Sequence, residues 1–242
     1  MAILEIEDLR KDFGGLAAVD GFSFRLGAGE LHALVGPNGC GKSTLFNLIT
    51  GTFPPTAGRV LFDGEDITGR PPHEISRLGV GRKFQVPAVF DELSVADNLA
   101  VPRWPGRRLG FWAAARAEAV DDILERVGLA DKRDRLAAEL AHGERQWLEI
   151  GMLLASRARL LLLDEPTAGM TVTETAATAA LIRGIADQGR ATILVIEHDM
   201  GFIRELDCPL TVMAKGRVLK SGSYADMRGD AEVRALYFGR GR

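Results

Sequence analysis

Gly36-Pro37-Asn38-Gly39-Cys40-Gly41-Lys42-Ser43-Thr44 fits the phosphate-binding pattern GxxxxGK[ST], and this stretch decides the fold. Its glycines let backbone N–H groups turn inward around a phosphate chain. The apolar run at residues 31–35 is expected to be a buried strand, and residues 45–49 a helix whose N-terminal dipole attracts anions. We therefore expect a nucleotide site in which Lys42 reaches the β and γ phosphates and the Ser43 hydroxyl holds Mg²⁺. The alternative is a glycine-rich turn that binds nothing.

The composition is that of an ordinary soluble globular protein. The 242 residues, 46% hydrophobic and 26% charged, suffice for one large core or for a core with a smaller lobe. The longest apolar stretches, at residues 160–163 and 192–196, are far shorter than the ~20 residues of a membrane helix. The chain begins with an acidic, alternating pattern, unlike the basic start and apolar middle of a signal peptide. We expect the chain to stay in the cytosol.

Cysteine count and charge argue against several classes of protein. Cys40 and Cys208 are far apart and lack metal-ligand spacing, so a disulfide framework or a zinc site is not expected. The net charge of −3 gives no general electrostatic reason to bind nucleic acid. A local basic cluster at residues 103–108 surrounds Trp104, and a solvated loop is the commoner meaning of such a cluster. We expect no nucleic-acid partner.

Hydrophobic periodicity predicts an α/β core interrupted by helices. The first sixty residues alternate like strands, whereas residues 112–128 have the spacing of an amphipathic helix. Beyond residue 158 short apolar strands alternate with helices, which predicts a parallel sheet covered on both faces. We expect a nucleotide-binding core at residues 1–86 and 157–242, with a helical lobe at 87–156. The expected strands are 3–9, 18–26, 59–62, 80–84, 160–163, 191–196, 210–213 and 217–219; the further helices are 73–78, 144–155, 173–187 and 199–206.

Two acids follow the apolar run at residues 160–163. Ligands of open α/β sheets gather outside the carboxyl ends of the strands, so Asp164 and Glu165 should face the phosphates. Asp164 would hold Mg²⁺ through its water shell, and Glu165 would accept a proton from the attacking water. The alternative is a strand-ending Asx turn. A second apolar strand ends near His198, which should lie at the same edge, although a lone histidine is more often structural.

In this order and spacing, the motifs resemble the ATP-binding subunits of ABC transporters over nearly the whole chain. The resemblance implies a P-loop NTPase core of α/β class (ABC ATPase), with an N-terminal antiparallel β-subdomain and an inserted helical subdomain. It assigns Phe13 to stacking on adenine, and Gln85 to the Q-loop that touches Mg²⁺ and the water and relays to the membrane partner. His198 is the switch histidine near the γ phosphate. The signature corresponds to Leu140-Ala141-His142-Gly143-Glu144, and the D-loop to residues 168–171.

Several runs narrow the resemblance within the family. They look like the group that imports branched-chain amino acids, urea and amides, and most like the first of the two ATPases in urea importers. These runs are EISRLG at residues 74–79, GRKFQ at 81–85, HGERQWLEIGM at 142–152 and AGMT at 168–171.

The signature departs from the usual LSGGQ. Ala141 replaces the serine, His142 the first glycine and Glu144 the glutamine. Losing one hydrogen bond to a charged group costs about 1.5–3 kcal/mol. His142 either donates to phosphate instead or only fills space, and the acid Glu144 weakens the site unless Arg145 offsets it. We expect Lys42, Asp164, Glu165 and His198 to form a competent half-site served by a partner's signature, and the reciprocal half-site to be slower.

Cys40 stands where a small Ala or Ser is commoner in the family. A helix N-terminus lowers the pKa of a thiol and makes it more reactive, so a thiol reagent should block ATP binding, with Mg-ATP protecting. The alternative is an inert buried thiol.

The resemblance also implies cofactors and partners. These are ATP and Mg²⁺, the permease membrane subunits, a second ATP-binding subunit that is identical or different, and, indirectly, a substrate-binding protein. The expected location is the cytoplasmic face of the inner membrane, as a peripheral subunit. The alternatives are a soluble ABC ATPase without a transport role and a regulatory module that binds nucleotide without hydrolysing it. Soluble members usually carry two cassettes or a long insertion, which 242 residues do not accommodate, and Glu165 with His198 argues against a module without hydrolysis.

Overall fold

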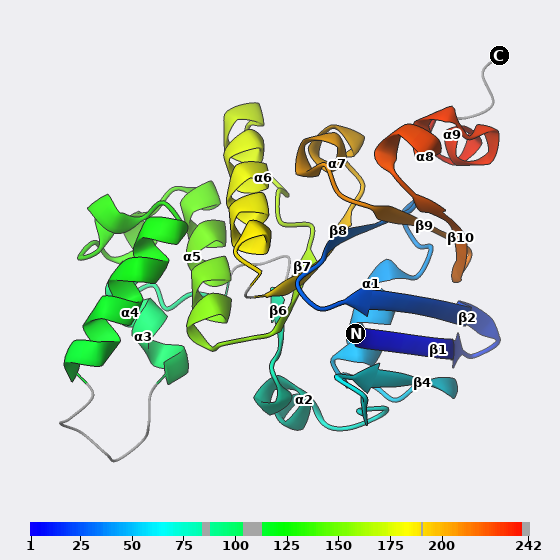
Figure 1. Ribbon diagram of the computed structural model, residues 1–242, viewed down its shortest axis with the longest axis horizontal. Coiled ribbons are helices and arrows are strands. Elements are labelled where there is room, and N and C mark those ends of the chain that lie inside the picture. Colours follow the sequence, from blue (N-terminus) through cyan, green and yellow to red (C-terminus); the bar gives the residue numbers. More distant parts are fainter. Residues whose placement is uncertain (84–87, 104–112, 190, 239–242) are drawn as a thin grey trace.

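The computed structural model describes residues 1–83, 88–103, 113–189 and 191–238. Two sheets and a group of helices make up this part of the chain (Figure 1). The predicted Q-loop residue Gln85 and most of the basic cluster around Trp104 lie outside the described residues.

A six-stranded sheet carries the phosphate-binding loop. Its order is β10-β9-β3-β8-β7-β6, so the strand before the loop, β3, lies between two strands that come much later in the sequence. The neighbours from β9 to β6 are parallel, and only β10 pairs antiparallel. The strands are β3 Leu31–Val35, β6 Val80–Lys83, β7 Leu160–Asp164, β8 Thr192–Glu197, β9 Leu210–Ala214 and β10 Arg217–Gly222.

Both faces of this sheet are buried. Successive side chains of a strand point to opposite faces, and in β7 Leu160 and Leu162 belong to one hydrophobic cluster while Leu161 and Leu163 belong to another. The first cluster includes α1 (Lys42–Ile49). The second includes α6 (Val172–Asp187), α7 (Met200–Leu206), α8 (Tyr224–Gly229) and α9 (Ala231–Phe238). The prediction of a parallel sheet covered on both faces is confirmed.

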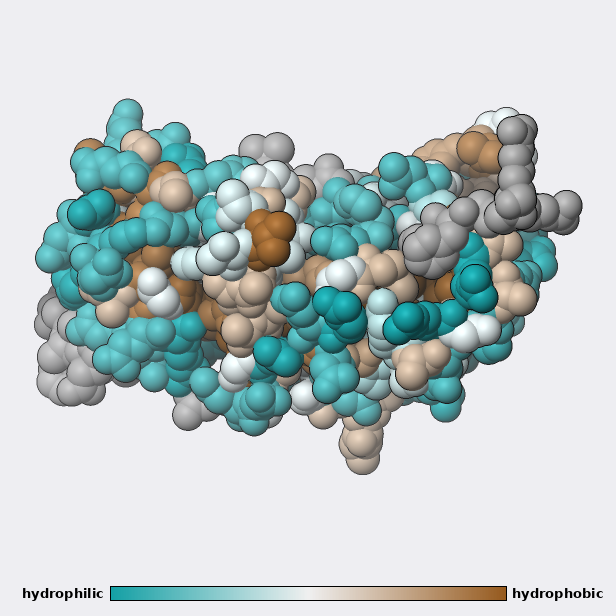
Figure 2. Space-filling model, turned by 90° about the horizontal axis from the view of Figure 1, so that it is seen from above, coloured by the Kyte–Doolittle hydropathy of each residue, from teal (hydrophilic) through white to brown (hydrophobic). Residues whose placement is uncertain are grey.

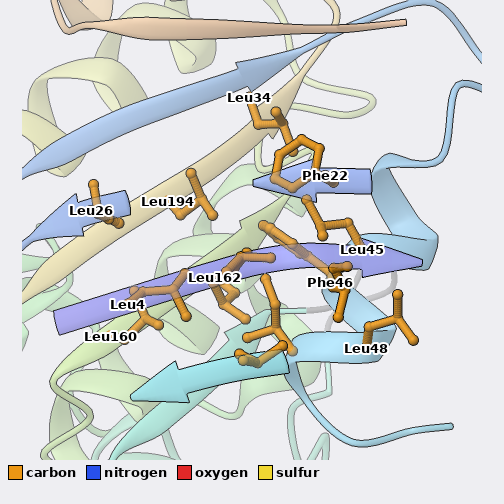
Figure 3. Packing of buried hydrophobic residues seen from close by; sticks show 14 of the residues in the cluster. Leu4, Phe22, Leu26, Leu34, Leu45, Phe46, Leu48, Leu160, Leu162 and Leu194 are labelled. Atoms are coloured by element: carbon orange, nitrogen blue, oxygen red, sulfur yellow. The ribbon is translucent and has the colours of Figure 1, made fainter. Parts of the chain in front are cut away.

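A four-stranded antiparallel sheet, in the order β2-β1-β4-β5, covers α1. Figure 3 shows Leu4 and Phe22 of this sheet lying with Phe46 of α1 and with Leu162 and Leu194 of the central sheet. The first two strands are longer than predicted, because Gly14 and Gly15 both have positive φ and form a tight turn that keeps their ends paired. The strands are β1 Ala2–Phe13, β2 Leu16–Gly27, β4 Ala57–Phe62 and β5 Glu65–Asp66.

Helices α3 to α5 lie together at one end of the molecule (Figure 1). Buried residues from all three, among them Leu99, Leu124 and Leu148, form a hydrophobic cluster of their own. They fall within the helical lobe predicted at residues 87–156, whose limits as a domain stay a prediction. The helices are α2 Pro72–Leu78, α3 Val95–Ala100, α4 Ala113–Arg126 and α5 His142–Ala155, and the short 3-10 turns are Val101–Arg103, Ala130–Lys132 and Ala137–Glu139.

The face of the molecule seen from above is mainly hydrophilic, and its hydrophobic areas are small and separate (Figure 2). Across the described ranges, none of the helices has the length and the apolar character needed to cross a membrane.

Candidate functional site

The loop between β3 and α1 needs glycine at two places. A Cβ on Gly36 would lie 2.3 Å from the carbonyl oxygen of Met213. At Gly41, where φ is +109°, a Cβ would lie 2.2 Å from the carbonyl oxygen of Ala18 on β2. Any larger residue would push the loop away from both sheets. Close packing against the two sheets therefore fixes the path of this loop.

Lys42 lies folded over the loop. Its side chain is buried, and its Nζ donates hydrogen bonds to the carbonyl oxygens of Gly36, at 2.7 Å, and Pro37, at 3.2 Å. Ser43, the next residue of α1, is exposed. An ammonium group and a hydroxyl group thus stand at the start of α1, where the helix dipole favours an anion.

Strand register brings the predicted acids to the edge of the sheet from which this loop leaves. Val35, the last residue of β3, pairs with Glu197 of β8, and Asp164 of β7 pairs with Ile196 of the same strand. Glu165 and His198 follow directly on β7 and β8. The expectation that these groups meet at one edge of the sheet is met by the structure.

A buried arginine holds Asp164. Nη2 of Arg82 on β6 donates to Oδ2 of Asp164 at 2.8 Å, and Nη1 donates to Oδ1 of Asn47 at 2.6 Å. The exposed fractions of the Arg82 and Asp164 side chains are only 8% and 3%. Sequence reasoning missed this role of Arg82, although a charged residue in a short apolar strand was the available signal.

The other carboxylate oxygen of Asp164 fits a magnesium site. Oδ1 is buried and accepts no hydrogen bond from the described residues. Mg²⁺ prefers oxygen ligands and retains several waters, so one carboxylate with phosphate oxygens suffices for it. Accordingly, no group of three or more His, Cys, Asp or Glu side chains within the described ranges is arranged to hold a metal ion.

Glu165 and His198 lie next to each other. Nδ1 of His198 is 3.4 Å from Oε1 of Glu165, and the two side chains are 56% and 22% exposed, respectively. The Glu165 backbone has a φ of 46°, an uncommon conformation for a residue with a side chain, and its N–H donates to the carbonyl oxygen of Ile196 at 2.9 Å. This conformation turns the chain sharply at the end of β7.

Glu197 fixes the loop that follows Glu165. Its buried carboxylate accepts hydrogen bonds from the hydroxyl of Thr167, at 2.6 Å, and from the backbone N–H of His198, at 3.1 Å. Sequence reasoning assigned no role to Glu197. An acid closing a long apolar strand was the signal for it.

A second buried ion pair joins β6 to α5. Nζ of Lys83 lies 3.8 Å from Oε2 of Glu149, and both side chains are almost fully buried. Burial lowers the pKa of Lys83, while Glu149, Asp164 and Glu197 act in the opposite direction. Oε1 of Glu149 also accepts a hydrogen bond from the N–H of Ala88 at 3.3 Å. One carboxylate of α5 therefore contacts the residues on both sides of the undescribed stretch 84–87.

Phe13 lies at the end of β1, and the residue is 46% exposed. Its ring meets the ring of Phe53 edge to face, with 5.4 Å between the centroids. Nζ of Lys11 is 5.1 Å from the centroid of each ring. Much of the Phe13 ring surface is thus open for stacking.

The signature region forms the start of α5. Glu144 accepts a hydrogen bond from the N–H of Ala141 at 3.0 Å and forms an ion pair with Lys132. Arg145 pairs instead with Asp91. The sequence left open whether Arg145 offsets the charge of Glu144, and in the structure Lys132, at the end of the turn Ala130–Lys132, is the cationic partner of Glu144 instead.

His142 contacts the segment predicted as the D-loop. Its Nε2 lies 3.0 Å from the carbonyl oxygen of Ala168, and a carbonyl can only accept, so the ring nitrogen donates. Neither expectation for His142, a phosphate donor or a filler of space, describes this hydrogen bond. The side chain of His142 is therefore hydrogen-bonded to the loop that follows Glu165.

Cys40 is a buried thiol. It is 5% exposed, and burial raises its pKa, although Lys42 acts in the opposite direction. The expectation of a thiol activated by the helix N-terminus is corrected, because the cost of burying a thiolate exceeds the effect of the nearby cation.

The chain is similar to known proteins over nearly its whole length. A family model described as ABC transporter matches residues 19–168, more than half of the chain. The identity is 36% over 249 residues to the high-affinity branched-chain amino acid transport ATP-binding protein BraF of Pseudomonas aeruginosa, and 34% over 249 residues to LivG of Escherichia coli K12, with 98% of each chain covered in both cases. Among solved structures, the ADP conformation of an ATP-binding cassette of an ABC transporter matches with a TM-score of 0.87 and 32% identity, covering 99% of this chain and 100% of that one.

Proposed function

Because this chain belongs to the ABC transporter family of ATP-binding subunits, we propose that it powers an importer of branched-chain amino acids, urea or short-chain amides. Its fold is that of an ABC ATPase, and ATP hydrolysis is the activity of this family. The observation that carries the proposal is the shared sheet edge where the loop at residues 36–44 meets Asp164, Glu165 and His198. The names of the relatives favour amino acids, while the runs HGERQWLEIGM and AGMT favour urea.

Different residues of this chain bind ATP and promote its hydrolysis. The backbone N–H groups at residues 36–44 and the Lys42 ammonium bind the phosphates, and the open ring of Phe13 stacks on adenine. Glu165 takes the proton of the attacking water, and His198, whose Nδ1 faces Glu165, contacts the γ phosphate. Ser43, Gln85 and Asp164 would hold Mg²⁺, which would supply neutralisation of the phosphate charge when bound.

A second ATP-binding subunit completes each site in this proposal. The start of α5 in one subunit supplies N–H groups to the ATP held by the other. Because Glu144 places a carboxylate in this region, the site that this chain's α5 serves is the slower of the two. Lys132 reduces that effect through its ion pair with Glu144.

The permease is proposed to bind between the core and the helical lobe. A cavity of about 350 Å³ lies between α2, β6 and α5, lined by apolar side chains such as Ile75, Val80 and Leu153. Glu149 also lines it, next to the stretch that contains Gln85. A short helix of a membrane subunit in this cavity would touch both parts of the chain, at the cytoplasmic face of the membrane.

Replacing Glu165 tests the hydrolytic role. In the complex reconstituted with its permease and second ATP-binding subunit, we expect Glu165→Gln in this chain to lower the ATPase rate by ~10² to 10⁴, because the water loses its proton acceptor. ATP binding should be kept. Glu232→Gln, at an exposed position on α9, is the matched control. Retention of most activity by Glu165→Gln would contradict the proposed site.

Transport assays distinguish the substrates. ATP-dependent uptake of labelled leucine or labelled urea by vesicles that contain the complete complex assigns the substrate directly. Co-purification with polytopic membrane proteins would support the importer, whereas co-purification with ribosomes or DNA would instead indicate a soluble ABC ATPase.

A further inference from the structure

The loop of residues 165–171, here called the Glu165 loop, connects the end of β7 to α6. Its first residue is the proposed proton acceptor, and its last, Thr171, caps α6. Two hydrogen bonds hold it to the core. The N–H of Glu165 donates to the carbonyl oxygen of Ile196, and the hydroxyl of Thr167 donates to the carboxylate of Glu197. Two short turns shape it: the N–H of Ala168 donates to Glu165, and that of Met170 donates to Thr167.

The first turn of α5 holds the same loop from the other side. The His142 ring donates to the carbonyl oxygen of Ala168 at 3.0 Å. Gly169 has a φ of +76°, and a Cβ there would lie only 3.3 Å from Nε2 of His142. Glycine at this position allows the ring to approach the backbone closely. In the usual LSGGQ signature, position 142 would be a glycine without a side chain to make this bond.

A second connection lies one turn further along α5. Nε1 of Trp147 donates to the hydroxyl of Thr178 on α6 at 2.9 Å, and this hydroxyl is 3.2 Å from the sulfur of Met170. Thr178 is completely buried. The Glu165 loop is thus linked to α5 at Ala168 directly and at Met170 through α6.

The start of α6 is pressed against the start of α5 at the same place. The Glu174 carboxylate accepts from the N–H and the hydroxyl of Thr171 at 2.8 and 2.7 Å. A Cβ on Gly143 would lie 2.8 Å from Oε1 of Glu174, so a larger residue at this position would displace the Glu174 side chain. The bonds from Thr171 lower the pKa of Glu174 most, and the Gly143 N–H and His142 add to them. The starts of the two helices and the Glu165 loop are thus connected by hydrogen bonds and close packing.

We propose that His142 is a positioning residue that couples the signature end of α5 to the proton acceptor Glu165 in the same chain. This inference rests on the proposed function. Residues 140–144 face another subunit's ATP, whereas Glu165 serves the ATP bound to this chain. A movement of α5 upon contact with the partner's ATP is passed through the His142–Ala168 hydrogen bond to the loop that begins at Glu165. Because a glycine at position 142 has no side chain to make this hydrogen bond, His142 supplies a connection between the two half-sites that the usual LSGGQ signature lacks.

Hydrogen exchange of the isolated chain tests the coupling without any hydrolysis. We expect His142→Ala to speed the exchange of the Ala168 and Met170 amides about two- to tenfold, the effect of losing one hydrogen bond. His142→Gln, which keeps an N–H donor, should restore slow exchange. His73→Ala is the matched control, because His73 is also exposed on a helix but lies on α2, remote from the Glu165 loop in sequence. Unchanged exchange at both amides in His142→Ala would overturn the proposal.

The assembled complex supplies the second readout. His142→Ala should lower the kcat of ATP hydrolysis about two- to tenfold with KM for ATP unchanged, and His142→Gln should recover most of the loss. A change in KM alone, or equal kcat for the Ala and Gln variants, would overturn the coupling. If the unaltered complex hydrolyses no ATP, the proposed function fails, while the exchange experiment still decides whether His142 holds the loop.

Discussion

Replacing Arg82 by methionine should lower the free energy of unfolding by about 3–5 kcal/mol. Methionine keeps much of the length and apolar volume of arginine but removes the guanidinium group. Asp164 would then remain in the interior without its cation, since only 3% of its side chain is exposed. An uncompensated buried charge is far more costly than the loss of a surface ion pair.

The size of the effect follows from how the guanidinium is held. It donates to Asp164 at 2.8 Å and to Asn47 at 2.6 Å, and its carbon lies 5.5 Å from the centroid of the Phe46 ring. Removal therefore leaves one buried carboxylate oxygen and one amide oxygen without this donor. A hydrogen bond to a charged group contributes about 1.5–3 kcal/mol and a neutral one about 1 kcal/mol, so the two lost bonds account for most of the predicted destabilisation.

Urea unfolding followed by circular dichroism measures this difference, and an exposed ion pair supplies the control. Arg59 lies 2.7 Å from Glu7, with side-chain exposures of 60% and 38%. Arg59→Met should cost less than about 1 kcal/mol, because water solvates both charges. The double variant Arg82→Met, Asp164→Leu should regain stability relative to Arg82→Met alone, since the carboxylate that lost its arginine is removed as well. The reasoning is refuted if Arg82→Met costs no more than Arg59→Met.

Two further predictions concern titratable groups that are partly or fully buried. Burial lowers the pKa of His32 to about 4, although Glu30 acts in the opposite direction. The difference from the usual pKa of 6.5 corresponds to about 3 kcal/mol in the free energy of unfolding. Because the unfolded chain takes up the proton first, the free energy of unfolding should fall as the pH drops from about 6.5 to 4. In unfolding experiments at several pH values, His32→Gln should reduce this decline. Parallel curves of stability against pH for the two proteins would contradict the prediction. Cys40, buried and with a raised pKa, should react slowly with a thiol reagent at pH 7, so mass spectrometry should find little modification until the protein unfolds. Rapid modification of folded protein, absent in Cys40→Ala, would show that burial does not protect the thiol.

Sequence reasoning identified the residues whose chemistry is expressed in a local pattern. The loop at residues 36–44 is read from nine consecutive residues, and the acids at 164 and 165 from the apolar strand that precedes them. Interactions between residues that are distant in sequence were not predicted. Arg82 is 82 residues from Asp164, and Lys83 is 66 residues from Glu149. Both cations lie in the same short strand, β6, which was predicted as a strand without any role for these charges.

The expectation of a phosphate site, and with it the α/β fold, came from the sequence, because a glycine-rich loop between a buried strand and a helix places backbone N–H groups and a helix N-terminus where they can surround a phosphate chain. The tertiary structure alone decided how the supporting side chains are used. Burial made Cys40 an unreactive thiol, and the meeting of α5 with the Glu165 loop gave His142 a backbone partner 26 residues away. Solvent access and hydrogen-bond partners depend on which distant segments come together, and local residue patterns do not specify that.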